Sequence, residues 1–309
     1  MKTFYSISNL EQCREIWQAA MGVDTLTDLW EVRACFQKHF NNRPHFIVAE
    51  DEQGICGLLP LSWLEQQNCY HFFPGETWQE KTWLEQNKIV CKRGVSWQDL
   101  LSRCPGGYHL RYLSEWPEES SQGCHIHIDE LGYLFLPPRY NYSSLNFFSE
   151  FSRKSMKTIL KELSRLESLG AEYRYDDFAD FGLMVELNIE RFGAQSYFFD
   201  PRFRDSFFDL ALYLKSKGWL RITTLLIEGE AAAIDMGAVY RDTYTLLAGG
   251  TCFRYPGAGK MINLHHIQRA CRERWDKVDF LCGDFKWKPL FHLTPRPLYL
   301  LANTTIKAA

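Results

Sequence analysis

The sequence lacks the segments that would place a protein in a membrane or export it. No apolar run reaches the roughly 18 residues that a membrane-spanning helix needs. The stretch MKTFYSISNLEQC contains no apolar core of signal-peptide length. These absences predict a protein without a membrane span that stays in the cytoplasm.

The cysteines form neither a disulfide framework nor a metal site. Ten cysteines are scattered singly, and no two are separated by only two residues. This spacing favours reduced thiols. Cys124, His125 and His127 are close in sequence, but strand alternation would direct Cys124 away from both histidines. We therefore expect no metal.

The charge balance gives no sign of a polyanionic partner. The chain has 35 Lys and Arg against 38 Asp and Glu, a net charge of -3. That balance excludes the global positive field of DNA-binding proteins, so DNA is not an expected partner. Aromatic residues make up 15% of the chain, which favours thick cores or a groove lined with rings.

Periodicity predicts two halves with the same order of elements. The first half reads as helices at 8–21 and 29–40, strands at 44–50, 55–63 and 69–73, a helix at 95–103 and a strand at 108–113. The second half reads as helices at 177–192 and 201–217, strands at 219–228, 231–240 and 243–249, a helix at 259–275 and a strand at 278–282. Capping boxes are expected at Ser8 with Glu11 and at Thr25 with Asp28.

Three segments lie between the halves: a predicted hairpin at 125–136, a Pro/Tyr loop at 136–144 and an amphipathic helix at 151–169. The loop is the natural boundary between lobes. The predicted domains are therefore residues 1–143 and residues 144–309.

A glycine-containing corner precedes the helix at 259–275. It consists of Pro256, Gly257, Ala258, Gly259 and Lys260. The first N–H groups of a helix have no intrahelical acceptor and carry the positive end of the dipole, so glycines there let an anion approach. Lys260 in the first turn is unfavourable for the helix unless an anion binds nearby. The alternative is a plain strand-to-helix turn.

The second half resembles the FemAB-like group of the GNAT acyltransferase superfamily. The resemblance is carried by segments in the expected order: RKSMKTILKELSRLESLG, ERFGAQSYFFDPRF, LLIEGEAAAIDMGAVYRDTYTLLAGG, RYPGAGKMINLHHIQRA and DFLCGDFKWK. The N-terminal half resembles the degenerate first lobe of such proteins. The resemblance implies an α/β (α+β) fold of two GNAT-like lobes, each a mixed, mostly antiparallel sheet flanked by helices.

This resemblance also implies a function. An N-acyltransferase would bind acetyl-CoA or another acyl-CoA, hold the donor pyrophosphate at the corner and pass the acyl group to a small amine acceptor. The matching place in the first half has one glycine and an acid, Gly75 and Glu76, so the donor is expected in the second lobe. Two alternatives stay open: transfer from aminoacyl-tRNA to a cell-wall precursor in cell-envelope biosynthesis, and a non-catalytic binding protein.

Asp235 is the first candidate for acid or base chemistry. Strand alternation places it among small residues on one face, where a carboxylate is either paired or set against a ligand. An attacking amine must lose a proton, which a carboxylate with a raised pKa accepts. A satisfied structural carboxylate is the alternative. Glu228 and Glu190 are weaker candidates.

Further candidates come from the resemblance. The ending Gly283-Asp284-Phe285-Lys286-Trp287-Lys288 resembles a family motif in which Lys288 would neutralise phosphate or the oxyanion and Trp287 would stand at the substrate. Arg191 matches a substrate-contacting position, and Tyr197 would line the groove. A solvated lysine and core aromatic rings are the alternatives.

Two further patterns have both a functional and a purely structural interpretation. On the helix at 151–169, Lys154, Lys157, Lys161 and Arg165 form a basic face opposite an apolar stripe that includes Leu160. That face is either solvated or contacts phosphates of CoA, tRNA or a nucleotide-sugar lipid. Cys282 and the pair His265–His266 suggest a thiol nucleophile, but a buried thiol and a helix surface are the favoured interpretations.

Overall fold

The computed structural model describes residues 1–115, 125–283 and 287–304. Contacts divide the chain into two compact units. The first comprises Met1–Leu131, Asp205–Leu210 and Pro297–Ala309, and the second comprises Gly132–Arg204 and Ala211–Arg296. Within the described ranges, no helix combines the length and the apolarity needed to cross a membrane.

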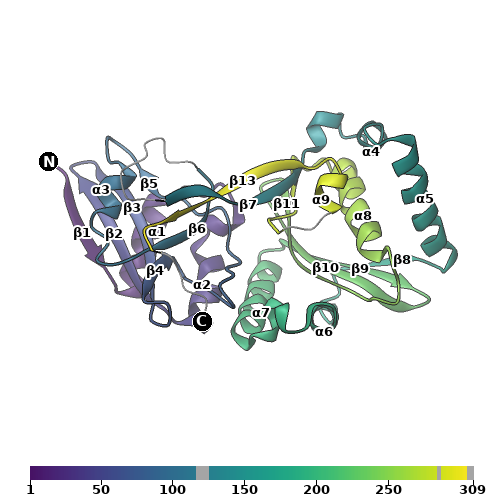
Figure 1. The fold of residues 1–309 in the computed structure, drawn as a ribbon, viewed down its shortest axis with the longest axis horizontal. Helices are drawn as coiled ribbons and strands as arrows, with labels where there is room; N and C mark the ends of the chain where they lie inside the picture. The colour runs from purple at the N-terminus through teal and green to yellow at the C-terminus, as the bar shows by residue number, and fades with distance from the viewer. Residues whose placement is uncertain (116–124, 284–286, 305–309) are drawn as a thin grey trace. The chain divides into compact units, whose positions relative to one another are not determined.

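The first unit is built on an antiparallel sheet in the order β1-β2-β3-β4 (Figure 1). Its strands are β1 (Thr3–Ile7), β2 (Arg43–Asp51), β3 (Gly54–Leu64), β4 (Cys69–Phe72) and β5 (Val90–Cys91), with β6 (His109–Leu113) paired to β13 (Thr294–Ala302). Its helices are α1 (Leu10–Ala20), α2 (Trp30–Phe40) and α3 (Trp97–Leu101). Each apolar sheet face must be covered, and helices cover both.

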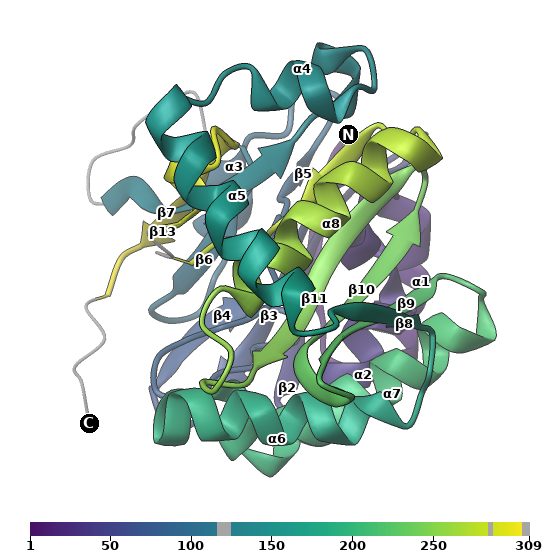
Figure 2. The ribbon, with the colours of Figure 1, turned by 90° about the vertical axis from the view of Figure 1, so that its right-hand side faces the viewer.

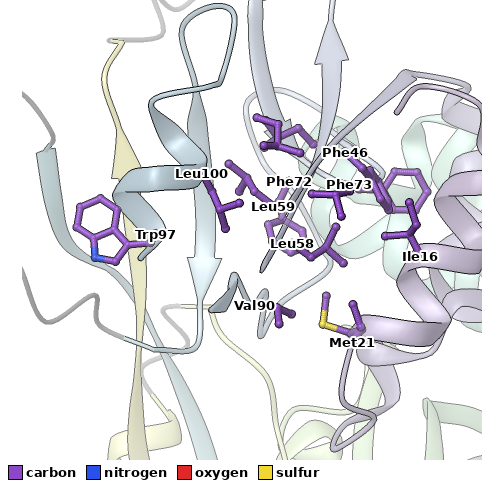
Figure 3. Packing of buried hydrophobic residues seen from close by; sticks show 14 of the residues in the cluster. Ile16, Met21, Phe46, Leu58, Leu59, Phe72, Phe73, Val90, Trp97 and Leu100 are labelled. Atoms are coloured by element: carbon purple, nitrogen blue, oxygen red, sulfur yellow. The ribbon is translucent and has the colours of Figure 1, made fainter. Parts of the chain in front are cut away.

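The core of the first unit lies between this sheet and its helices. Figure 3 shows Phe46 and Phe73 on the side of Ile16 from α1, while Leu100 from α3 lies across the strands. A Cβ on Gly57 would lie 3.3 Å from the side chain of Leu100, so α3 packs directly on β3. The strands are therefore buried on both faces.

The second unit has a sheet in the order β7-β12-β11-β10-β9-β8. Its strands are β7 (His125–Phe135), β8 (Glu172–Tyr175), β9 (Leu220–Ile227), β10 (Glu230–Tyr240), β11 (Thr243–Thr251) and β12 (Lys277–Asp279). Its helices are α4 (Ser144–Phe148), α5 (Arg153–Ser168), α6 (Asp180–Phe192), α7 (Pro201–Ser216), α8 (Ala258–Glu273) and α9 (Trp287–Leu290). All pairs are antiparallel except β11 with β12, which is parallel.

Helices cover both faces of β9–β11 (Figure 2). A Cβ on Gly250 would lie 2.5 Å from the Met184 carbonyl oxygen, which places α6 tightly on one face. His266 of α8 contacts Asp235 of β10 on the other face. α8 is thus enclosed, and its residues are buried on more than one side.

The predicted repeat is confirmed. The first unit contains α1, α2, β2-β3-β4, α3 and β6 in chain order, and the second contains α6, α7, β9-β10-β11, α8 and β12. Each unit is a mostly antiparallel sheet flanked by helices, as the predicted fold class requires.

Several local predictions were wrong. Residues 125–136 are not a hairpin, because β7 runs unbroken over His125–Phe135. Asn9, rather than Ser8, caps α1. The predicted Thr25–Asp28 capping box, in contrast, is confirmed, and it encloses a 3-10 turn before α2. The first contact boundary falls at Leu131–Gly132, while the domains 1–143 and 144–309 stay a prediction.

Candidate functional site

The predicted phosphate corner lies at the start of α8. Gly257 is the N-cap residue with φ of 98°, a conformation that suits glycine. The Ala258 N–H donates to the Tyr255 carbonyl at 3.0 Å. No side chain of the described residues caps α8, so the N–H groups of Gly259 and Lys260 remain in the first turn without an intrahelical acceptor. The backbone therefore has the form of an anion site.

Two side chains of α5 cover this corner. Glu162 pairs with the Lys260 ammonium, and the Arg165 guanidinium donates to the Pro256 carbonyl at 2.6 Å. A Cβ on Gly257 would lie 3.8 Å from the Glu162 carboxylate and 3.6 Å from Leu166. An acidic side chain thus lies beside the position that the sequence assigned to a phosphate.

The strands beside the corner separate. β11 and β12 pair only from Thr243 with Lys277 to Thr245 with Asp279. β11 then continues to Thr251, whereas the Phe280 N–H turns to the Tyr133 carbonyl at 2.9 Å. The remaining length of β11 thus leaves its parallel neighbour and leads to the corner.

Asp235 is paired inside the second unit. Its Oδ2 lies 2.9 Å from His266 Nε2, and the exposed fractions are 5% for Asp235 and 0% for His266. A carboxylate that accepts from Nε2–H fixes the imidazole tautomer and leaves Nδ1 as the basic nitrogen. His266 Nδ1 is buried and has no hydrogen-bond partner within the described residues. The pair has the arrangement of a base and its orienting carboxylate.

Small residues make room for this pair. A Cβ on Gly249 would collide with Asp235 Oδ1, and a Cβ on Gly237 would lie 2.5 Å from the Tyr244 ring. Tyr244 stacks on His266 at 4.9 Å and on Trp275 at 5.2 Å between centroids. The two glycines are therefore required by close packing.

Two hydroxyl groups beside the pair are also buried without a partner in the described structure. They are Thr223 Oγ1, from the cross-strand neighbour of Asp235, and Tyr244 Oη. Burial, with a smaller contribution from Asp235, holds the pKa of Tyr244 well above its ordinary value. The phenol therefore stays protonated. Unsatisfied buried groups in a native fold are rare and often mark functional sites.

Lys288 is held by the backbone. Its ammonium donates to the carbonyls of Phe280, Leu281 and Cys282 at 2.9, 2.9 and 2.7 Å, and the side chain is 2% exposed. An ammonium has three donors, and these bonds use all of them. The arrangement closes the turn after β12. The catalytic role of Lys288 remains a prediction.

The predicted substrate residues are not gathered around Asp235. Arg191 is exposed in the last turn of α6, the helix on the opposite sheet face from α8. Tyr197 packs on Phe203 at 5.0 Å. Trp287 packs on Phe291 at 5.3 Å as part of the core. Their substrate contacts stay predictions.

The weaker candidates also have ordinary surroundings. Glu228 is an exposed turn residue whose carboxylate lies 3.4 Å from the Tyr255 hydroxyl, and Glu190 is exposed on α6. Asp284, Phe285, Lys286 and Cys124 lie outside the described residues. No group of three potential metal ligands occurs in the described part of the chain.

The prediction that His265 and His266 lie on a helix surface was wrong. Both are buried, because α8 lies between the sheet and further packed side chains. His265 stacks on Tyr173 at 3.9 Å and shares a hydrogen bond of 3.1 Å with the Tyr175 hydroxyl. Burial, aided by His266, lowers the pKa of His265 to about 3. Cys282, predicted as buried, is half-buried.

The apolar stripe of α5 is narrower than predicted. Ile159 and Leu166 are buried, but Leu160 is 54% exposed. Lys154, Lys157 and Lys161 are exposed, as a basic face requires. Sequence reasoning missed Glu162 and His266 as site residues. Helical spacing alone offers no signal for them, since their partners lie on other elements.

A comparison with family models matches residues 153–289 to an acetyltransferase (GNAT) domain. This segment contains α5, the Asp235–His266 pair and the corner. Residues 153–289 are thus similar to a GNAT acetyltransferase domain. No curated protein matches the sequence significantly.

Solved structures with a similar fold extend over the whole chain. A conserved protein of unknown function from Bacteroides thetaiotaomicron is 16% identical, with a TM-score of 0.59, over 98% of this chain and 99% of that one. FemX is 9% identical, with a TM-score of 0.59, over 96% of each chain. A tandem GNAT protein from the clavulanic acid biosynthesis pathway is 8% identical, with a TM-score of 0.54, over 99% and 100%. The fold of the chain is therefore similar to that of FemX and of this tandem GNAT protein.

Proposed function

We propose that this chain is an N-acyltransferase that takes its acyl group from an acyl-CoA and passes it directly to an amine acceptor in the cytoplasm. The observation that carries the proposal is the corner at the start of α8, which follows the length of β11 that no longer pairs with β12. The N–H groups of Gly259 and Lys260 would receive the donor phosphates. The edge of β11 would supply N–H groups to the thioester carbonyl.

The Asp235–His266 pair would serve as the base. The amine nitrogen attacks the thioester carbon, the carbon–sulfur bond breaks, and CoA leaves as the thiolate. The proton lost by the amine passes to His266 Nδ1, whose Nε2–H is held by Asp235 at 2.9 Å. The thiolate takes up a proton from solvent. No covalent enzyme intermediate is needed.

Donor binding tests the proposal. Titration with CoA and acetyl-CoA should raise the melting temperature, since a ligand at a hundred times its dissociation constant adds about 2.7 kcal/mol of stability. Gly259→Glu places a carboxylate in the corner and should abolish the shift. Gly182→Glu is the matched control, because nothing lies within 4 Å of a Cβ there. An equal shift in both variants would show that the corner is only a turn.

Measurement of turnover tests the role of the Asp235–His266 pair as the base. Release of free CoA thiol from acetyl-CoA would be followed with a panel of amines. Asp235→Asn keeps a side chain of the same size but stabilises the wrong tautomer of His266, so we expect kcat to fall by about a hundredfold or more with donor affinity unchanged. Unchanged turnover would reduce the pair to a structural role.

A second donor is favoured by one observation. The exposed lysines of α5, Lys154, Lys157 and Lys161, lie on the helix that covers the corner. Aminoacyl-tRNA would bind such a face through its phosphates, and its affinity would fall steeply with salt. Triple substitution of these lysines by Gln should weaken tRNA binding strongly and CoA binding slightly. A salt-independent response to CoA alone would exclude the tRNA donor.

A further inference from the structure

The first unit contains a cleft that the proposed acyl transfer does not use. Its volume is about 360 Å³, within the range of small-molecule sites. It is lined by Arg43, His45, Trp63, Tyr70, Pro105 and Gly106. These residues all belong to the first unit, whereas the corner and the Asp235–His266 pair belong to the second.

Strand pairing places the key side chains in one row. Arg43 of β2 is the cross-strand partner of Trp63 in β3, and Trp63 is the partner of Tyr70 in β4. Directly paired residues point to the same sheet face. His45 lies two residues after Arg43 and points the same way. A cation and three rings therefore stand together at one end of the sheet.

The three aromatic rings of the cleft are tilted against one another. The Trp63 and Tyr70 centroids lie 4.9 Å apart with planes at 59°, and those of His45 and Tyr70 lie 5.3 Å apart at 43°. Gly106 closes one side, since a Cβ there would lie 3.5 Å from Tyr70. Tilted rings leave π faces available to a ring-shaped ligand.

Two polar groups of the cleft, on Arg43 and His45, have no partner among the described residues. Arg43 forms no ion pair with any described residue. His45 Nε2 is buried and has no hydrogen-bond partner in the described ranges. Burial, with a contribution from Arg43, lowers the pKa of His45, so its imidazole stays neutral. The cleft thus offers one unpaired cation and one unsatisfied neutral nitrogen beside an aromatic surface.

We propose that this cleft binds a phosphorylated ring compound, either a nucleotide or a sugar phosphate. The ring packs on Trp63 and Tyr70, and the phosphate pairs with the planar guanidinium of Arg43, which matches phosphate oxygens two at a time. His45 Nε2 hydrogen-bonds a polar edge of the ring. Because ring and phosphate contact different groups, the two parts contribute separately to affinity.

The test is titration of the full chain with four probes, monitored by calorimetry and by the change in tryptophan fluorescence. The probes are uridine monophosphate, ribose 5-phosphate, uridine and inorganic phosphate. We expect uridine monophosphate or ribose 5-phosphate to bind below about 1 mM, with uridine and phosphate at least about tenfold weaker. Tighter binding of uridine monophosphate identifies a nucleotide site, and equal binding identifies a sugar phosphate site.

Substitutions test whether the probes bind in this cleft. Arg43→Gln should weaken the phosphorylated probes at least about tenfold, while Arg14→Gln, which removes an exposed arginine of α1, should not. Trp63→Ala should lower affinity and abolish the fluorescence change. Gly259→Glu should leave the titration unaltered, which separates this site from donor binding. No binding by any probe, or binding that survives both Arg43→Gln and Trp63→Ala, would overturn the proposal.

Discussion

Glu162 of α5 forms an ion pair with Lys260 in the first turn of α8. This contact places a carboxylate next to the N–H groups that would bind donor phosphates. A phosphate and a carboxylate of like charge compete for the same cation. The ion pair therefore makes donor binding depend on the position of α5.

Glu162→Gln should tighten the binding of CoA. The substitution removes the competing negative charge and frees Lys260 for the phosphates, so we expect affinity to rise by about three- to tenfold in calorimetric titration at low salt. Glu167→Gln, at an exposed position of the same helix, is the control and should have little effect. Weaker binding by Glu162→Gln would mean instead that Glu162 positions Lys260 for the donor.

Gly249→Ala should destabilise the second unit. The new Cβ collides with Asp235 Oδ1, and overpacking of this kind costs about 1–3 kcal/mol in urea unfolding. Gly182→Ala is the opposite case, since its Cβ meets open space in α6 and should add up to about 1 kcal/mol. The cost of Gly249→Ala should disappear when Asp235 is also replaced by Ala. A cost that persists there would place the strain elsewhere.

Lys288→Met should lower stability while leaving CoA affinity unchanged. Its removal leaves three carbonyl groups without their donor, at a cost of about 2–4 kcal/mol. Lys217→Met, at an exposed position, should cost almost nothing. If Lys288→Met folds stably and loses turnover, the predicted catalytic role is supported instead.

Acid should destabilise the protein through its buried histidines. Burial first, and neighbouring His109, lowers the pKa of His71 to about 3, and the pKa of His265 is lowered equally. Between about pH 3 and 6.5 the unfolded chain binds protons at these residues that the folded chain does not. The free energy of unfolding should therefore fall as the pH decreases, by up to about 1.4 kcal/mol per pH unit for each histidine. In urea unfolding from pH 7 to 4.5, His265→Gln should show a smaller slope. An unchanged slope would contradict the assignment.

The order of helices and strands could be predicted from the sequence because it depends on patterns that extend over a few neighbouring residues. The alternation of β10 predicted the strand and the inward position of Asp235, and Pro201 marked the start of α7. The missed elements β1 and β8 lie at sheet edges, where half-exposed strands have a weak pattern. The false hairpin at 125–136 arose from turn-forming residues inside β7, a strand that lies between β13 and β12 in the sheet.

Sequence alone determined the repeated order of helices and strands and the glycine corner at Gly257 and Gly259, because periodicity and backbone freedom act over a few residues. Only the tertiary structure decided what those residues contact. The partners Glu162–Lys260 and Asp235–His266 are 98 and 31 residues apart. Their contacts depend on which helix covers which sheet face, and packing of the whole unit fixes that choice.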